Sequence, residues 1–93
     1  MSYDIYYYDK EENDGYTTSV GYARAEAFRY GFNEDFEWFN SINNKTGIES
    51  KDLIIKAIEK IKASKYEDTG IHILKYMLEL IEIKPEYIWD ISL

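Results

Sequence analysis

Residues 3–21 have the sequence YDIYYYDKEENDGYTTSVG, and this stretch decides the fold class. Residues 3–9 are rich in Tyr and Ile, which fill the pleated surface of a β-strand. The turn sequence Asn-Asp-Gly at 13–15 tolerates a positive φ. Residues 16–21 contain Thr and Val and indicate a second strand. We therefore expect an antiparallel hairpin whose acidic loop has about five or six residues.

The chain that follows favours helices, because its apolar residues recur at helical spacing. A first helix is expected to begin at Tyr22 and to end at Gly31. Its buried stripe is predicted to contain Ala23, Ala27 and Tyr30. A short helical segment from residue 33 or 34 should then place Phe32, Phe36 and Phe39 in the core.

Two longer helices and a final strand complete the pattern. Thr46 and Glu49 have capping-box spacing, with Ser50 as a competing N-cap, and start a helix through about Ala63. Its buried stripe is predicted to contain Ile54, Ile58 and Ile61. After a break at 66–70, a third helix runs to Pro85, which ends it. Its inward residues are predicted to be Ile71, Leu74, Met77, Leu78 and Ile81. Residues 86–93 are β-branched and aromatic and indicate a last strand.

The predicted fold is a single α+β domain over residues 1–93, in the order β-β-α-α-α-β, with helices packed on one face of an antiparallel sheet. Side chains alternate between the faces of a strand, so Tyr3, Ile5 and Tyr7 should point toward the helices. Tyr6 and Tyr8 should then point to the opposite, aromatic and wet, face. In the last strand, Trp89 and Ile91 are expected to point inward.

The composition excludes several classes of function. The chain of 93 residues has no Cys, one His and a net charge of −7. A disulfide scaffold and a thiolate metal site are therefore excluded, and direct binding of nucleic acid or an anionic membrane is disfavoured. Because its first residues lack a basic, apolar signal sequence, the protein is expected to be cytoplasmic.

No pattern for catalysis or for a cofactor is present. The loop at 9–15 lacks the acidic first position and the twelfth-position Glu of a calcium-binding loop. His72 lies on the polar side of its helix, without the partners that a metal or a general base requires. The glycines form neither a phosphate loop nor a dinucleotide motif. We expect no enzyme activity, no metal and no cofactor.

The acidic residues are unevenly distributed. Residues 1–40 have nine acids and three bases, whereas residues 41–93 have nine acids and eight bases. Clustered carboxylates steer a basic partner, and aromatic side chains anchor it. The predicted partner-binding residues are Glu11, Glu12, Asp14, Glu34, Asp35 and Glu37 for charge, with Tyr6, Tyr8 and Trp38 as anchors.

The opening residues 1–6, MSYDIY, together with the hairpin, the helices and the short last strand, resemble small phage-encoded accessory proteins. The whole chain is similar in size, acidity and Tyr content to phage anti-defence proteins, anti-CRISPRs among them. This resemblance implies an inhibitor that binds a host nuclease or surveillance complex and places carboxylates where nucleic-acid phosphates would lie. It identifies no functional residue by itself.

Two other functions stay open. One is a small-ligand sponge or sensor that stacks a nucleotide base in an aromatic pocket, where Arg24 and Arg29 would have to offset the excess of acids. The other is a structural domain with no partner beyond itself. A homodimer also stays open, whereas a monomer that does not bind nucleotides would favour the inhibitor.

Overall fold

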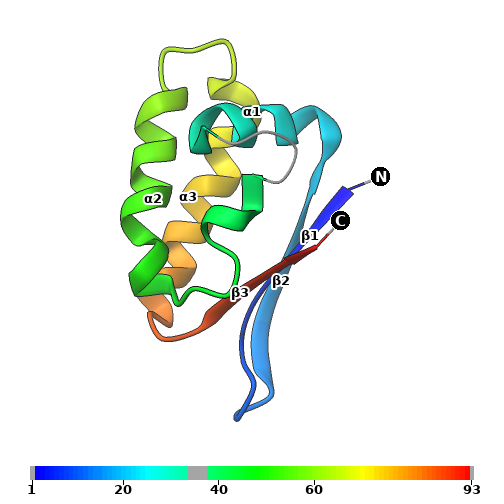
Figure 1. The fold of residues 1–93 in the computed structure, drawn as a ribbon, viewed down its shortest axis with the longest axis vertical. Helices are drawn as coiled ribbons and strands as arrows, with labels where there is room; N and C mark the ends of the chain where they lie inside the picture. Colours follow the sequence, from blue (N-terminus) through cyan, green and yellow to red (C-terminus); the bar gives the residue numbers. More distant parts are fainter. Residues whose placement is uncertain (1, 34–37, 93) are drawn as a thin grey trace.

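A computed structural model of the protein describes residues 2–33 and 38–92. Its elements are β1 (Ser2–Asp9), β2 (Asp14–Gly21), α1 (Tyr22–Phe32), the 3₁₀-helix η1 (Trp38–Ser41), α2 (Gly47–Ile61), α3 (Glu67–Ile83) and β3 (Ile88–Ser92). The predicted α+β class and element order are confirmed. The helices lie on one side of the sheet, and the tip of the β1–β2 hairpin projects beyond them (Figure 1).

The sheet has the strand order β2-β1-β3, and both pairs of neighbouring strands are antiparallel. The last strand therefore joins the hairpin, as predicted. The ladder between β1 and β2 continues to the pair Asp9 and Asp14, so the loop consists of residues 10–13 alone. It is shorter than expected because Asn13, with φ of 51°, completes the reversal of the chain.

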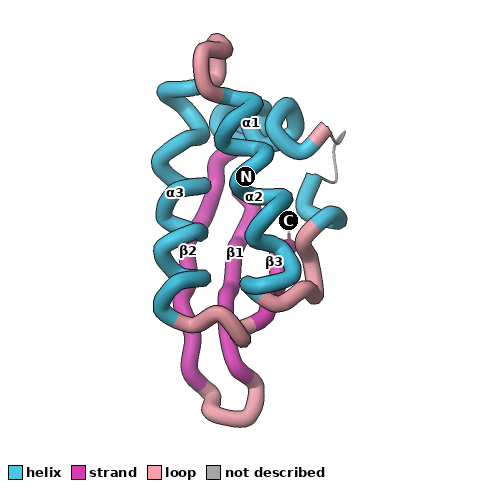
Figure 2. The backbone as a smooth tube through the Cα atoms, turned by 90° about the vertical axis from the view of Figure 1, so that its left-hand side faces the viewer, coloured by secondary structure: helices cyan, strands magenta, loops and turns pink. Residues whose placement is uncertain are grey.

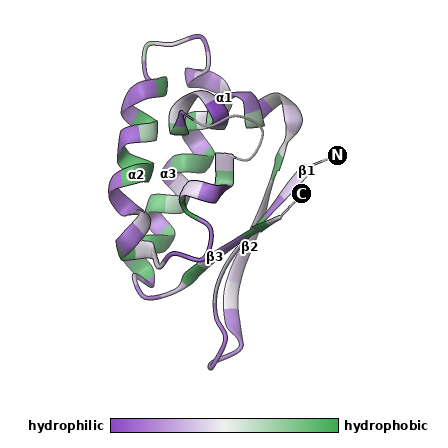
Figure 3. Ribbon diagram, in the orientation of Figure 1, coloured by the Kyte–Doolittle hydropathy of each residue, from purple (hydrophilic) through white to green (hydrophobic). Residues whose placement is uncertain are grey.

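The inner face of the sheet forms one wall of the core. Tyr3, Ile5 and Tyr7 of β1 are buried, as are Trp89 and Ile91 of β3, which confirms the predicted alternation. Figure 2 shows the helices covering this face. In the hydropathy colouring of Figure 3, hydrophobic residues recur along the helices and β3, whereas the hairpin tip is hydrophilic. No helix of the described part of the chain covers the opposite face of the sheet.

Helix α1 passes through Gly31, so the prediction that this glycine ends the helix is wrong. The end lies at Phe32, and Asn33 forms the C-cap in the left-handed conformation (φ 56°, ψ 29°). A Cβ at position 31 would lie 3.2 Å from the Cβ of Ala57 on α2. The glycine therefore serves close packing between α1 and α2.

The buried stripe of α1 also differs from the prediction. Ala27 is buried, but Tyr30 is 40% exposed, while the side chain of Ala23 lies outside the described part. The buried residues are Ala25, Ala27, Phe28 and Phe32. Tyr30 instead packs at the surface, 5.2 Å from the ring of Tyr66 and 4.8 Å from the ammonium of Lys60.

Trp38 is fully buried, so the prediction of an exposed anchor at this position is wrong. Its ring centroid lies 4.7 Å from that of Phe28, 5.5 Å from Tyr3 and 5.9 Å from Phe32. The acidic neighbours of Trp38 in the sequence suggested an exposed position. Packing against the surrounding aromatic rings instead favours burial of this side chain. The predicted residues Glu34, Asp35, Phe36 and Glu37 lie outside the described residues.

The capping box at the start of α2 is confirmed. Thr46 Oγ1 accepts a hydrogen bond from the Glu49 amide (3.2 Å), and the Thr46 amide donates to Glu49 Oε1 (3.0 Å). Ser50, the competing N-cap, is instead buried inside the helix. Its hydroxyl donates to the Gly47 carbonyl (3.0 Å) and accepts from Trp89 Nε1 (2.8 Å). Ser50 thereby links the first turn of α2 to β3.

Helix α2 ends at Ile61, before the predicted Ala63, which has a positive φ of 64°. Helix α3 begins at Glu67 and includes Gly70, which was expected in the break. A Cβ at Gly70 would lie 2.7 Å from the Cβ of Ala27, so this glycine also permits close helix packing. The predicted inward residues of both helices are buried, except that Leu78 is half-buried. Within the described ranges, no helix is both long and apolar enough to cross a membrane.

Candidate functional site

The face of the sheet that points away from the helices, called the outer face, is the candidate site. Strand alternation and the register place eleven residues on it. They are Ser2, Asp4, Tyr6 and Tyr8 from β1, Gly15, Thr17, Ser19 and Gly21 from β2, and Ile88, Asp90 and Ser92 from β3. The structure thus brings the two predicted tyrosine anchors together on one surface.

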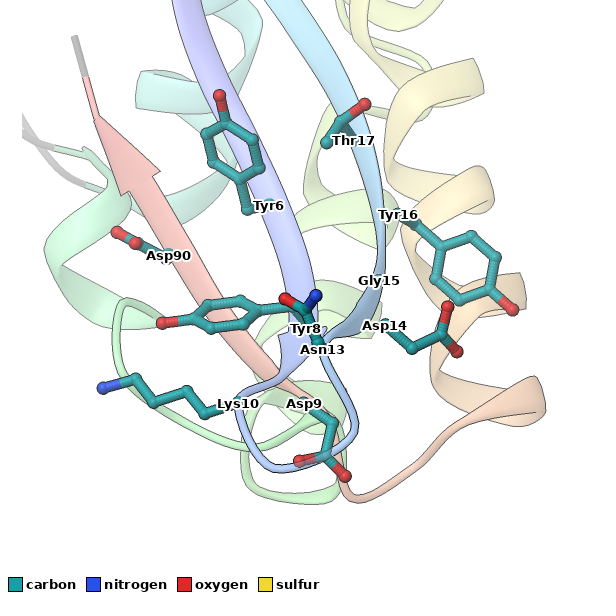
Figure 4. A pocket seen from close by; sticks show the side chains of 10 residues that line it. All are labelled: Tyr6, Tyr8, Asp9, Lys10, Asn13, Asp14, Gly15, Tyr16, Thr17 and Asp90. Atoms are coloured by element: carbon teal, nitrogen blue, oxygen red, sulfur yellow. The ribbon is translucent and has the colours of Figure 1, made fainter.

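Tyr6 is the centre of the outer face. Its side chain is 42% exposed, and it lies between Thr17 and Asp90 on the neighbouring strands. Two shallow depressions flank it, with volumes of about 550 and about 360 Å³, and Tyr6 lines both. In Figure 4, Tyr6, Tyr8 and Asp90 lie on one side of the sheet, whereas Tyr16 points to the other. A partner's side chains can therefore enter on either side of the Tyr6 ring.

Gly15 determines where Tyr8 can lie. The two residues are cross-strand partners, and a Cβ at position 15 would lie 2.6 Å from the Tyr8 Cβ and 2.9 Å from the Tyr7 carbonyl oxygen. From the sequence alone, Gly15 is predicted only as a turn residue. A glycine paired with a tyrosine across a hairpin indicates such a close approach. The pairing can be recognised only when the register of the two strands is known.

The outer face is negatively charged. Asp4 and Asp90 are exposed, and their carboxylates have no hydrogen-bond or ion-pair partner among the described residues. Neither carboxylate was among the predicted partner-binding residues. Lys10 is the cation that lines the larger depression, beside Asp9, Asp14 and Asp90. An excess of carboxylates around a tyrosine favours a cationic ligand.

The hairpin loop extends this negative charge, but its acids have different roles. The Asp9 carboxylate accepts a hydrogen bond from the Glu11 amide (2.9 Å), which orders the turn. Glu11 and Glu12 are exposed at the tip, as predicted. Asp14 is also exposed, but its carboxylate accepts a hydrogen bond from the hydroxyl of the buried Tyr87 (2.7 Å). Asp14, which was predicted as a partner-binding residue, therefore also has a structural role.

Two tyrosine hydroxyls connect the hairpin to the rest of the fold. The hydrogen bond to Asp14, together with burial, raises the pKa of Tyr87 well above its ordinary value. Burial raises the pKa of Tyr7 as well, with a contribution from the Glu86 carboxylate. The Tyr7 hydroxyl donates to the Lys84 carbonyl. Both phenols are thus held neutral in the folded protein.

These pKa shifts predict a loss of stability at high pH. Both folded-state pKa values lie above the unfolded value of about 10, so the stabilisation is complete below pH 10 and is lost as the pH rises further. We expect the free energy of unfolding to fall above about pH 10, and to fall less steeply in Tyr87→Phe. Urea unfolding at a series of pH values measures both slopes. Equal slopes for the two proteins would contradict the role of Tyr87.

The remaining predicted candidates lie away from this surface. His72 is exposed on α3, as predicted. Arg24 and Arg29 belong to α1 and do not line either depression. In residues 2–33 and 38–92, no three His, Asp or Glu side chains converge as metal ligands. The described candidates therefore reduce to the outer face and the hairpin tip.

In comparisons with known proteins, no family model, no curated protein and no solved structure matched the chain. Its function has to be argued from the geometry and charge of the outer face.

Proposed function

We propose that the protein is a non-enzymatic binding protein whose outer face and hairpin tip dock onto a basic surface of a partner protein. The observation that carries this proposal is the exposed Tyr6 ring between two depressions, with the unpaired carboxylates of Asp4 and Asp90 nearby. Tyrosine is enriched at interfaces because it offers a large rigid contact area with a polar tip. Binding is favoured over catalysis because the depressions lie on an open sheet surface, without walls that exclude water.

The partner's chemistry follows from the charge. Asp4, Asp90, Glu11 and Glu12 are exposed carboxylates, and Lys10 is the base among them. Arginine fits such a surface best, since its guanidinium stacks on tyrosine and pairs with carboxylates. The carboxylates would speed the encounter, and the tyrosines would slow dissociation.

The specific form of the proposal is a phage anti-defence inhibitor of the anti-CRISPR kind. Its target would be a host nuclease or surveillance complex with a basic groove that binds nucleic acid. Two observations support this form: the resemblance of the chain to such proteins in size and composition, and the acidic surface beside the exposed Tyr6 and the half-buried Tyr8. Competition with nucleic acid for the same groove distinguishes it from other binding functions.

A small-ligand sponge is the alternative. The larger depression, at about 550 Å³, falls within the usual size range of ligand sites. However, Asp9, Asp14 and Asp90 line it against a single Lys10, and neither Arg24 nor Arg29 reaches it. This charge balance disfavours a phosphorylated ligand, so a nucleotide is the weaker candidate.

Charge reversal at the hairpin tip tests the proposal. A fluorescently labelled arginine-rich peptide serves as the probe, with binding followed by anisotropy at about 20 mM and about 150 mM salt. We expect Glu11→Lys/Glu12→Lys to weaken binding by about tenfold at low salt and to flatten the salt dependence. Tyr8→Ala should instead mainly increase the dissociation rate. Asp14 is left unchanged because its carboxylate accepts the Tyr87 hydrogen bond.

The matched control is Glu59→Lys/Glu79→Lys, which changes the net charge equally on exposed positions of α2 and α3. It should change the affinity by less than about twofold. Equal weakening by the two double variants would show that net charge alone, and not the hairpin surface, attracts the peptide.

A further inference from the structure

The two edges of the sheet differ in how they are covered. The edge of β3 is paired with residues 43–46: the Asn44 amide donates to the Trp89 carbonyl (2.9 Å), and the Trp89 amide donates to the Lys45 carbonyl (3.0 Å). The Asn43 side chain accepts from the Ile91 amide (2.9 Å) and donates to the Ile91 carbonyl (3.2 Å). The Asn43 side chain thus makes the hydrogen bonds that a further strand would make. The outward amides and carbonyls of Trp89 and Ile91 all have partners.

The alternation of antiparallel hydrogen bonds shows which groups of β2 point outward. The backbone amides of Trp89 and Ile91 donate to residues 43–45, on the side of β3 that faces away from β1. The backbone groups of Ile88 and Asp90 therefore bond to β1, where their partners are Tyr8 and Tyr6. The residues between these partners, such as Tyr7, then bond to β2.

On β2, the residues that bond to β1 are the partners of Tyr7 and Ile5, namely Tyr16 and Thr18. The amides and carbonyls of Thr17 and Ser19 therefore point outward. No hydrogen bond to these groups occurs among the described residues. The edge of β2 is a row of unsatisfied donors and acceptors.

The edge of β2 also lacks the features that usually prevent an edge strand from pairing with another chain. Its pairing with β1 is continuous from Asp14 to Gly21, without a bulge. Residues 15–21 contain neither Pro, Lys nor any other charged residue. Natural edge strands usually carry such a feature, and a bare edge of this length pairs readily with another strand.

We propose that β2 pairs antiparallel with β2 of a second copy of this chain, giving a continuous six-stranded sheet. With the two-fold axis at Thr18, Thr17 faces Ser19 of the second copy, and each such pair exchanges both backbone bonds. Thr and Ser are also favourable cross-strand neighbours. The two helical layers lie on the same side of the joined sheet, because this axis is perpendicular to it.

The distribution of charge along β2 fits a second copy as the occupant. The acids on and next to β2 lie at its hairpin end, in Asp14 and the loop. Antiparallel pairing places these two acidic ends at opposite ends of the interface, whereas the shared centre consists of Thr17, Thr18 and Ser19. No like charges face each other across the centre. The inference does not depend on the proposed function.

The first test is the mass of the protein in solution. Size-exclusion chromatography with light scattering, from about 10 μM to about 1 mM, should give twice the mass of one chain at the higher concentrations. Ser19→Pro removes one outward amide and no intramolecular bond, so it should remain a monomer at all of them. Ser19→Ala keeps that amide and should behave as the unchanged protein. A monomeric unchanged protein throughout, or a dimeric Ser19→Pro, would overturn the proposal.

Hydrogen exchange tests the same pairing without a variant. The amides of Thr17 and Ser19 should become protected as the protein concentration rises, whereas those of Tyr16 and Thr18 should be protected at every concentration. Rapid exchange of Thr17 and Ser19 at about 1 mM would overturn the proposal, even if Ser19→Pro failed to fold.

Discussion

Trp38→Ala is expected to lower the free energy of unfolding by about 3–5 kcal/mol, measured by urea denaturation. Trp38 is fully buried, and its ring contacts those of Tyr3, Phe28 and Phe32. Alanine would leave a cavity between α1 and the sheet that the surrounding rings can only partly fill. A loss below about 1 kcal/mol would mean that Trp38 is not a core residue.

The two tryptophans allow a matched comparison. Trp38 Nε1 is buried and has no hydrogen-bond partner within residues 2–33 and 38–92, whereas Trp89 Nε1 donates to Ser50 Oγ (2.8 Å). Both Trp→Phe substitutions remove the same volume, but only Trp89→Phe removes a hydrogen bond. We expect Trp89→Phe to cost about 1 kcal/mol more than Trp38→Phe. Equal costs would show that the Ser50 bond contributes nothing to stability.

Gly47→Ala is expected to destabilise the protein by about 1–3 kcal/mol, although an alanine usually favours a helix. Gly47 is the first residue of α2 and is buried. A Cβ there would overlap the Tyr7 hydroxyl and lie 3.0 Å from the Pro85 carbonyl oxygen. The added methyl group must displace either the tyrosine or the chain before β3.

Two comparisons make this prediction specific. Gly21→Ala serves as the control, because a Cβ at Gly21 meets no atom within 4 Å. It should leave the midpoint of urea unfolding nearly unchanged. In a Tyr7→Phe background, Gly47→Ala should cost less, since the overlapping oxygen is gone. The same cost in both backgrounds would contradict the proposed overlap.

Local patterns in the sequence were sufficient for most of the fold. The alternation in Tyr3, Ile5 and Tyr7 and the spacing of Thr46 and Glu49 depend on neighbours along the chain. Such signals act within one element, so they can be recognised without knowing what the element contacts. For this reason the strands, the capping box and the main helices were predicted correctly.

The sequence-based predictions were wrong where a contact between distant parts of the chain determines the structure. Gly31 and Gly70 were interpreted as helix breakers, but each lies inside a helix where two backbones approach closely. Trp38 was assigned to the surface because of its acidic neighbours, although Phe28 and Tyr3 enclose it. Asp90 was missed because only the pairing of β1 with β3 brings it near Tyr6, whereas strand alternation alone would have placed Asp4 on the face of Tyr6.

The most direct test of the proposed binding surface is a map of backbone amide shifts by NMR as an arginine-rich peptide is added to the unchanged protein. We predict that the largest shifts occur at Tyr6, Tyr8, Thr17, Asp90 and the loop at 10–13, and that a glutamate-rich peptide of equal length causes none of them. Shifts centred on the exposed sides of α2 and α3, or no shifts at low salt, would contradict the account.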